Sequence, residues 1–214
     1  MVYNNRSKSK KDGYTLKDIL TVKILYTDGL KYEDIKKSPL LTDEDRIFAD
    51  GFKKTEDKIS RLSSAYLKRK YVGDWALLKT GKPVSDKLCF SISHCDGLTA
   101  FVTAKNSVGI DVENIRPIDN GLKAFACHEC ELNACSGDKD FFAVWTAKES
   151  LVKAEGGGMS AHPNNVLSLP FTGKKEYRGQ AYYSVGLTLG EYALSVTRKG
   201  EEEFKIKIEE ESIF

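Results

Sequence analysis

The stretch that decides the fold is Val108-Gly109-Ile110-Asp111-Val112-Glu113, in the middle of the chain. Its apolar residues alternate with other types, and β-branched side chains suit a pleated surface, so the stretch predicts a β-strand. The same alternation places Asp111 and Glu113 on one face, roughly 6.5 to 7 Å apart along the strand. Two like charges at that separation repel, and one carboxyl would stay protonated unless a cation lay between them.

A third carboxylate lies further along the chain, in Trp145-Thr146-Ala147-Lys148-Glu149-Ser150-Leu151-Val152-Lys153. An apolar stripe with helical spacing predicts that this segment is a helix. Three carboxylates, Asp111, Glu113 and Glu149, together with water oxygens suit Mg²⁺, a hard octahedral cation that normally also binds phosphate. The two segments together therefore indicate phosphate chemistry.

The helix also has a simpler interpretation. Glu149 and Lys153 are four residues apart, and an exposed pair at that spacing contributes only about 0.2 to 0.5 kcal/mol to helix stability. Lys148, however, falls in register with the apolar stripe, where a charge is costly unless it has a partner. An anionic ligand at an interface would be one such partner.

The remaining elements indicate an α+β fold with two similar, pseudo-symmetric lobes, each with helices packed on a small, mainly antiparallel sheet. In the first half, a weak strand within 16–26 and a helix from Thr55 or Asp57 to about Gly73 precede strands at 88–93 and 98–104. The second half contains a helix over 138–155 and strands at 166–169, 180–187, 192–197 and 204–208.

These elements predict an N-terminal lobe over residues 1–107, with 1–13 as a flexible tail, and a C-terminal lobe over 108–214. A faint similarity between residues 97–105 and 190–199 suggests duplication without proving it. Ligand sites tend to lie at interfaces of this kind, so we expect the active site between the lobes.

The composition limits the classes of function. A chain of 214 residues with 41% apolar residues is globular, and a net charge of +2 supports neither a nucleic-acid nor a membrane-surface role. No apolar run approaches the ~20 residues of a membrane span, and the polar start does not resemble a secretory signal. Five cysteines, an odd number, favour reduced thiols and a cytoplasmic location.

The segment Cys127-His128-Glu129-Cys130, with Cys135 beyond it, has to be weighed as a zinc site. No second pair of cysteines or histidines closes a tetrahedral shell, so inert, partly buried thiols are the favoured interpretation.

His94 ends the strand Phe90-Ser91-Ile92-Ser93, close in sequence to the acidic strand. A lone histidine is most often structural, but here a phosphate could accept a hydrogen bond from its ring. The densest basic region comprises Arg61, Lys68, Arg69, Lys70, Lys79 and Lys82. A solvated helix face is the default interpretation for Arg61 and Lys68, whereas a ligand with several phosphates would use two or three of these cations.

Taken together, the motifs resemble those of the Sfp-type 4′-phosphopantetheinyl transferases. The resemblance is carried by Gly81-Lys82-Pro83, Phe90 to His94, Gly109 to Glu113 and Trp145 to Lys153, in the family's order and with compatible spacings. The paired acidic strand with the W-x-x-K-E-S-x-x-K helix is specific, whereas either alone would be weak. The length is similar to the two-lobed members of the family, which implies a monomer with pseudo-dimeric lobes.

The resemblance implies a role for each matching residue. Asp111, Glu113 and Glu149 would bind Mg²⁺, with Mn²⁺ as the alternative. Ser93, His94, Lys148 and Lys153 would contact the phosphates of coenzyme A, with Lys82 near the adenine and Arg61 at the 3′-phosphate. Glu149, Lys153 and Glu129 would be catalytic, with Glu129 supporting a base or a metal-bound water. The region from Asp45 to Phe52 lacks the lysines that some members use on the nucleotide.

The implied reaction transfers the 4′-phosphopantetheine group of coenzyme A to a serine of an apo acyl or peptidyl carrier protein and releases adenosine 3′,5′-bisphosphate. Which carrier is served, in fatty-acid or secondary-metabolite synthesis, stays open. The main alternative is a non-catalytic protein that binds coenzyme A or the carrier. A different Mg²⁺-dependent nucleotide enzyme is the other, although no motif specifies its attacking group.

Overall fold

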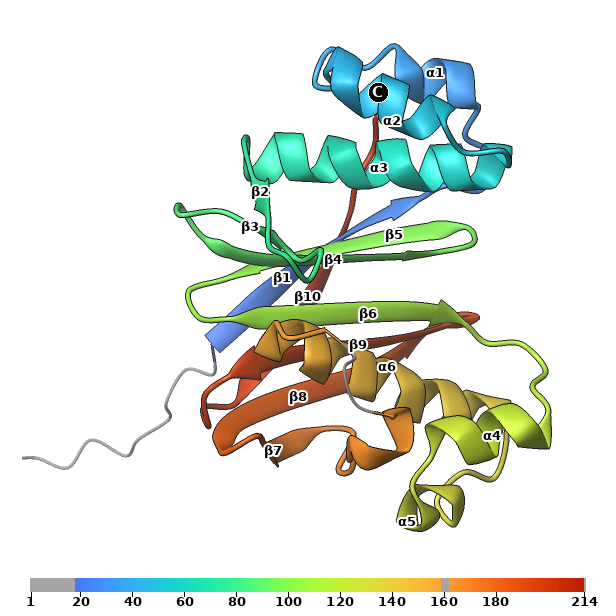
Figure 1. The fold of residues 1–214 in the computed structure, drawn as a ribbon, viewed down its shortest axis with the longest axis vertical. Helices are drawn as coiled ribbons and strands as arrows, with labels where there is room; N and C mark the ends of the chain where they lie inside the picture. The colour runs from blue at the N-terminus through green and yellow to red at the C-terminus, as the bar shows by residue number, and fades with distance from the viewer. Residues whose placement is uncertain (1–17, 159–161, 214) are drawn as a thin grey trace, which may run out of the picture.

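The computed structural model describes residues 18–158 and 162–213, which form two four-stranded sheets (Figure 1). The first sheet, in the order β10-β1-β5-β4, comprises β1 (Asp18–Tyr26), β4 (Cys89–Cys95), β5 (Leu98–Ala104) and β10 (Phe204–Glu210). The second, in the order β6-β9-β8-β7, comprises β6 (Val108–Asn114), β7 (Gly173–Tyr177), β8 (Gln180–Leu189) and β9 (Tyr192–Lys199). A short hairpin pairs β2 (Ala76–Leu77) with β3 (Pro83–Val84).

Each sheet carries a long helix. α3 (Thr55–Tyr71) lies over β4 and β5, with α1 (Tyr32–Lys36) and α2 (Asp43–Asp50) packed on it, and α6 (Asp138–Glu155) packs against β6, β9 and β8 (Figure 1). α4 (Asn120–Ala126) and α5 (Glu129–Leu132) connect β6 to α6, and the 3-10 helix η1 (Pro163–Asn165) follows α6. This arrangement confirms the predicted α+β class. Across residues 18–158 and 162–213, no helix combines the length and apolar character that crossing a membrane requires.

The two sheets share one hydrophobic core, built from alternate residues of their strands. Val22 and Ile24 of β1, Val102 of β5 and Ile110 and Val112 of β6 all belong to it. On β6 the intervening residues therefore face away from this core, toward α6, which packs along the strand. The sequence prediction for this strand is confirmed, and its consequence is that Asp111 and Glu113 share the face that meets α6.

The course of the last strand differs from the predicted division at residue 107. β10 pairs in parallel with β1, so residues 204–210 belong to the first sheet and not to a separate C-terminal lobe. Two ion pairs hold β10 and the residues after it in this position: Lys23 on β1 bonds Glu209, and Lys70 on α3 bonds Glu211. The pairing of β10 with β1 has a physical reason. Without β10, β1 would present an unpaired edge, and a covered edge avoids pairing with other chains.

The strand expected at 166–169 is absent, since Val166 follows a 3-10 turn, and β7 forms later at Gly173–Tyr177. The faint repeat falls on equivalent elements, because β5 and β9 each lie between two partners in their own sheets. The proposed tail at 1–13 lies outside the described residues.

Gly109 allows β6 and α6 to approach each other closely. A Cβ atom at this position would lie 2.5 Å from the backbone nitrogen of Ala154 and 2.9 Å from Lys153 Cβ, and would meet the Ser150 carbonyl oxygen. The obstacle is largely backbone, which cannot rotate aside. The helix that carries Glu149 can therefore lie against the acidic strand only because residue 109 has no side chain.

We expect Gly109→Ala to lower the free energy of unfolding by about 1 to 3 kcal/mol, as overpacked cores do. Urea unfolding followed by circular dichroism measures this loss. Gly137→Ala is the matched control, since its added Cβ would meet no atom within 4 Å and its φ is −162°. Equal stability losses for the two variants would show that close packing at Gly109 is unimportant.

Candidate active site

A cavity of about 570 Å³ is lined by residues of α3 and α6, the long helices of the two sheets, and of strands β4 and β6. Most of the residues predicted from the sequence line it: Arg61, Ser93, His94, Asp111, Glu113, Glu149 and Lys153. A neighbouring cavity of about 310 Å³ shares Glu149 and Lys153 with it and is lined by Lys82. The strand, the strand end and the helix noted in the sequence therefore converge on one place.

Asp111 is the most buried of the three carboxylates, with 4% of its surface exposed. Its Oδ1 accepts hydrogen bonds from Ser93 Oγ at 2.8 Å and from Lys153 Nζ at 2.6 Å. Its Oδ2 is buried and has no hydrogen-bond partner among the described residues. A buried carboxylate oxygen without a partner carries a desolvation penalty, which a cation in the cavity would offset.

Glu113 and Glu149 reach the same cavity from β6 and α6. Burial, followed by the charge of Asp111, raises the pKa of both carboxyl groups above the usual range. Such crowding of negative charge is relieved when a divalent cation binds. Within the described residues, no three His, Cys, Asp or Glu side chains lie close enough together to hold a metal ion. The three carboxylates would therefore have to move closer to one another to bind one. The donor set, all carboxylate oxygen, fits Mg²⁺.

Lys153 and His94 supply hydrogen-bond donors to the cavity, the first charged and the second neutral. Lys153 Nζ donates to Ser93 Oγ at 3.0 Å as well as to Asp111, and so ties α6 to β4 and β6. Burial, then the positive charges of Arg61 and Lys153, lowers the pKa of His94 to about 4. The imidazole is therefore neutral near pH 7, and it can donate one hydrogen bond to a phosphate without adding charge.

Lys82 lies at the edge of the site. Its Nζ donates to the backbone carbonyl of Lys153 at 2.6 Å, near the end of α6, and burial lowers its pKa. The Gly81-Lys82-Pro83 turn is thereby attached to the helix that carries Glu149.

The structure corrects the placement expected for Lys148. This side chain is fully buried, and its Nζ contacts Glu131 at 2.5 Å and donates to the carbonyls of Ala126 and Pro163. It lines neither of the two cavities. Lys148 does have the partner that its position in the apolar stripe requires, but this partner is a carboxylate of the same chain and not a ligand phosphate.

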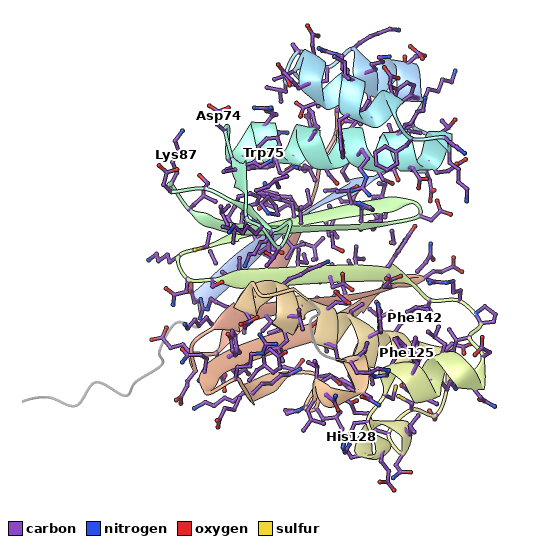
Figure 2. All side chains as sticks on the ribbon, in the orientation of Figure 1. Asp74, Trp75, Lys87, Phe125, His128 and Phe142 are labelled. Atoms are coloured by element: carbon purple, nitrogen blue, oxygen red, sulfur yellow. The ribbon has the colours of Figure 1, made fainter. Side chains whose placement is uncertain are left out.

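Glu129 also lies away from the site. It is exposed at the first position of α5, and neither cavity is lined by it. Its neighbour His128 lies at the outer edge of the molecule (Figure 2). The buried carboxylate of this segment is Glu131, which also accepts from the His128 backbone at 2.8 Å and from Ser168. The three-residue spacing from His128 to Glu131, typical of a capping box, could have indicated it.

Other residues of the cavity were either not singled out from the sequence or, in the case of Lys68, placed by default on a solvated helix face. Phe48 of α2 and Leu77 of β2 are mostly exposed at its wall, and Ser64 and Lys68 of α3 also line it. The signal available for α3 was the spacing of positions 61, 64 and 68, which places them on one helix face.

The fold and site define an α+β protein whose acidic cavity is suited to a divalent cation and a phosphate-bearing ligand. Residues 107–197 match the family model of the 4′-phosphopantetheinyl transferase superfamily. One similar protein is the 4′-phosphopantetheinyl transferase gsp of Aneurinibacillus migulanus, 38% identical over 86 residues. The match covers 37% of this chain and 36% of that relative, so the chain is matched to about a third of the relative's length.

These comparisons confirm the resemblance that the motifs indicated. The matched segment contains Asp111, Glu113, Glu149 and Lys153, whereas Arg61, Lys82, Ser93 and His94 lie outside it. Residues inside and outside the matched segment nevertheless line the same cavity of about 570 Å³.

Proposed function

We infer that this protein is a 4′-phosphopantetheinyl transferase, which transfers phosphopantetheine from coenzyme A to a serine of an apo acyl or peptidyl carrier protein. The observation that carries the inference is the convergence of Asp111, Glu113 and Glu149 on one cavity with Lys153. There the buried Asp111 Oδ2 has no hydrogen-bond partner in the part of the chain that the structure describes. The superfamily match over residues 107–197 supports the same reaction.

The three carboxylates would hold the divalent cation, with Mg²⁺ favoured and Mn²⁺ as the alternative. When bound, the ion supplies charge neutralisation for the pyrophosphate of coenzyme A and for the phosphate that leaves. Transfer of this kind depends on positioning and charge stabilisation more than on covalent help from the protein.

The cationic and neutral donors of the cavity position the phosphates. Lys153 is held at Asp111 and Ser93, and its ammonium would also offset charge on the leaving phosphate. Ser93 and neutral His94 would donate to phosphate oxygens, and Lys82 would lie toward the adenine. Lys148 takes no part in substrate contact, because its donors are used inside the protein.

The reaction forms a bond between the carrier serine Oγ and the β-phosphorus of coenzyme A. The bond from that phosphorus to the bridging oxygen breaks, and adenosine 3′,5′-bisphosphate leaves with the electron pair. The serine proton needs an acceptor at the cavity, and the carboxylate of Glu149, whose pKa burial raises, is suited to that role.

The test is incubation of the purified protein with coenzyme A, Mg²⁺ and a panel of apo carriers, followed by intact-protein mass spectrometry. A carrier that gains the mass of one phosphopantetheine group supports the transferase. Nucleotide consumed without that gain would indicate a different nucleotide enzyme. Binding of coenzyme A without turnover would favour the non-catalytic alternative, although all three candidate metal carboxylates are present at the cavity.

Phe48 supports a prediction about the adenine. Phe48 is 62% exposed at the cavity wall, in a region where the sequence lacks the lysines that some family members use on the nucleotide. Stacking of a base on an aromatic ring contributes about 1 to 3 kcal/mol. We expect Phe48→Ala to raise the KM for coenzyme A about tenfold with little change in kcat. Ile47→Ala, at a residue that is 71% exposed and outside the cavity wall, is the control. An unchanged KM in Phe48→Ala would exclude the stacking role.

A further inference from the structure

A chain of four buried hydroxyl groups lies between α6 and the second sheet. Ser150 Oγ on α6 lies 3.0 Å from Ser195 Oγ and 2.8 Å from Thr197 Oγ1, both on β9. Thr197 Oγ1 in turn lies 2.8 Å from Ser184 Oγ on β8. All four residues are 0% exposed, so bulk water cannot replace these bonds. A hydroxyl donates one hydrogen bond and accepts two, so the chain can satisfy all four groups.

The hydroxyls of β9 lie beside the acidic strand. Ser195 and Thr197 alternate with residues of the core shared by the two sheets, and so they face α6. In the antiparallel pairing of β6 with β9, Ser195 is directly opposite Asp111. Thr197 is opposite Gly109, the residue that lets α6 approach the sheet. Directly opposed residues share one face of a sheet, so Ser150 bonds the immediate neighbours of Asp111 and Gly109.

These hydrogen bonds fix α6 where apolar contacts alone would not. Leu151 and Val152 of α6 are buried against Val166 and Tyr182, but apolar contact is non-directional and tolerates a small shift of the helix along the sheet. A hydroxyl–hydroxyl bond needs about 2.5 to 3.0 Å between its oxygens, so a shift of about 0.5 Å weakens it. The hydroxyl chain therefore defines the position of α6 along β9.

The position of α6 matters for the carboxylates. Glu149 directly precedes Ser150 and lines the cavity together with Asp111 and Glu113. These three side chains must move closer to one another to hold an ion, since no such cluster is closed within residues 18–158 and 162–213. How far Glu149 has to move depends on where α6 lies relative to β6.

We propose that Ser150 is a positioning residue of the divalent-cation site. Through Ser195 and Thr197 its hydroxyl holds α6 at the level of Asp111, and so places Glu149 to share an ion with the carboxylates of β6. The inference rests on the proposed function in that the cavity binds a divalent cation. No role for the Ser150 hydroxyl follows from the motifs or from the family match.

The test is calorimetric titration of Mg²⁺, and separately of Mn²⁺, into the parent protein and into Ser150→Ala. We expect Ser150→Ala to raise the Kd for Mg²⁺ about tenfold, which is at the low end of the effect of residues that orient metal ligands. Carrier modification should fall at limiting Mg²⁺ and recover in excess Mg²⁺, because the ion can still draw Glu149 into place. Thermal unfolding checks that the variant is folded.

Thr146→Val is the matched control. Thr146 is also buried on α6, but its hydroxyl donates to the Phe142 carbonyl of the same helix at 2.8 Å and does not tie the helix to the sheet. This variant should lower the Tm and leave the Kd for Mg²⁺ unchanged. Thr197→Ser keeps a hydroxyl and should retain the parental Kd. Thr197→Val keeps the shape without the hydroxyl and should raise the Kd as Ser150→Ala does.

Three results would overturn the proposal: an unchanged Kd in Ser150→Ala, an equal rise of the Kd in Thr146→Val, or no binding of either cation by the parent protein. The outcome is separable from that of the proposed function. A parent protein that bound Mg²⁺ but modified no carrier would refute the transferase, and the Kd values would still decide whether Ser150 positions the cation site.

Discussion

Asp111→Asn is expected to lower kcat/KM for carrier modification about 10³-fold while the protein stays folded. The substitution keeps an oxygen that can accept from Ser93 and Lys153. It replaces Oδ2, which is buried and has no hydrogen-bond partner within residues 18–158 and 162–213, with an amide NH₂ group. One negative charge is thereby removed from the site of three carboxylates. The loss is measured by the rate of carrier modification in Mg²⁺, with thermal unfolding as the check on folding.

A second measurement tests cation binding separately from catalysis. Ligands that bind only the folded protein raise its stability by an amount that depends on concentration over Kd. We therefore expect Mg²⁺ to raise the Tm of the parent protein and to have a smaller effect on Asp111→Asn. Asp86→Asn, at an exposed carboxylate that lines neither site cavity, should behave like the parent in both assays. An Asp111→Asn variant that modified a carrier at the parental rate would falsify the metal assignment.

The acidic strand was predictable because the information is local. Alternation in residues 108–113 places Ile110 and Val112 in the core and Asp111 and Glu113 opposite, as the structure has them. The helix over 138–155 is likewise confirmed from its apolar stripe and its glycine end. Hydrophobic periodicity and capping residues predict one helix or strand at a time. The acidic strand and this helix could be predicted because each pattern lies within a single element.

The features that the sequence did not reveal depend on contacts between distant segments. β10 was expected as a strand, but its pairing with β1 joins residues almost the whole chain apart. Lys68 was placed on a solvated face because helical periodicity does not show that Trp75, just beyond the helix, lies under its ammonium. β7 was missed since Gly173-Lys174-Lys175-Glu176-Tyr177 is a polar edge strand without apolar alternation.

α6 shows how these local and distant contacts combine. Glu149 and Lys153 face the cavity, and Gly109 receives the helix backbone near Ser150. Lys148, one residue before Glu149, points instead into the protein and bonds Glu131 of α5 and the carbonyl of Pro163. The helix is thus fixed on one side by a buried ion pair and presents on another side the carboxylate that we propose to be catalytic. Under that proposal, stability and activity depend on adjacent residues of the same helix.

Lys148→Met is expected to destabilise the protein by about 3 to 5 kcal/mol, because it leaves the carboxylate of Glu131 buried without its cation. Both side chains are 0% exposed, and their contact distance is 2.5 Å. Urea unfolding measures the loss. Lys174→Met is the matched control, since the Lys174–Glu201 pair has side chains 63% and 68% exposed and should contribute at most about 1 kcal/mol.

The double variant Lys148→Met/Glu131→Leu separates the charge from the packing. Replacing both members of a buried pair by apolar residues removes the uncompensated charge, so the double variant should regain more than half of the stability lost by Lys148→Met. It should also respond less to acid. Burial alone would raise the pKa of Glu131, but bonds from Lys148, Ser168 and the His128 backbone lower it below the usual range. A carboxyl of that kind stabilises the fold above its unfolded-state pKa, and the contribution is lost as the pH falls through the folded-state value. A double variant as unstable as Lys148→Met, with an unchanged acid limb, would mean that the lysine acts through its shape and its carbonyl bonds and not through the charge of Glu131.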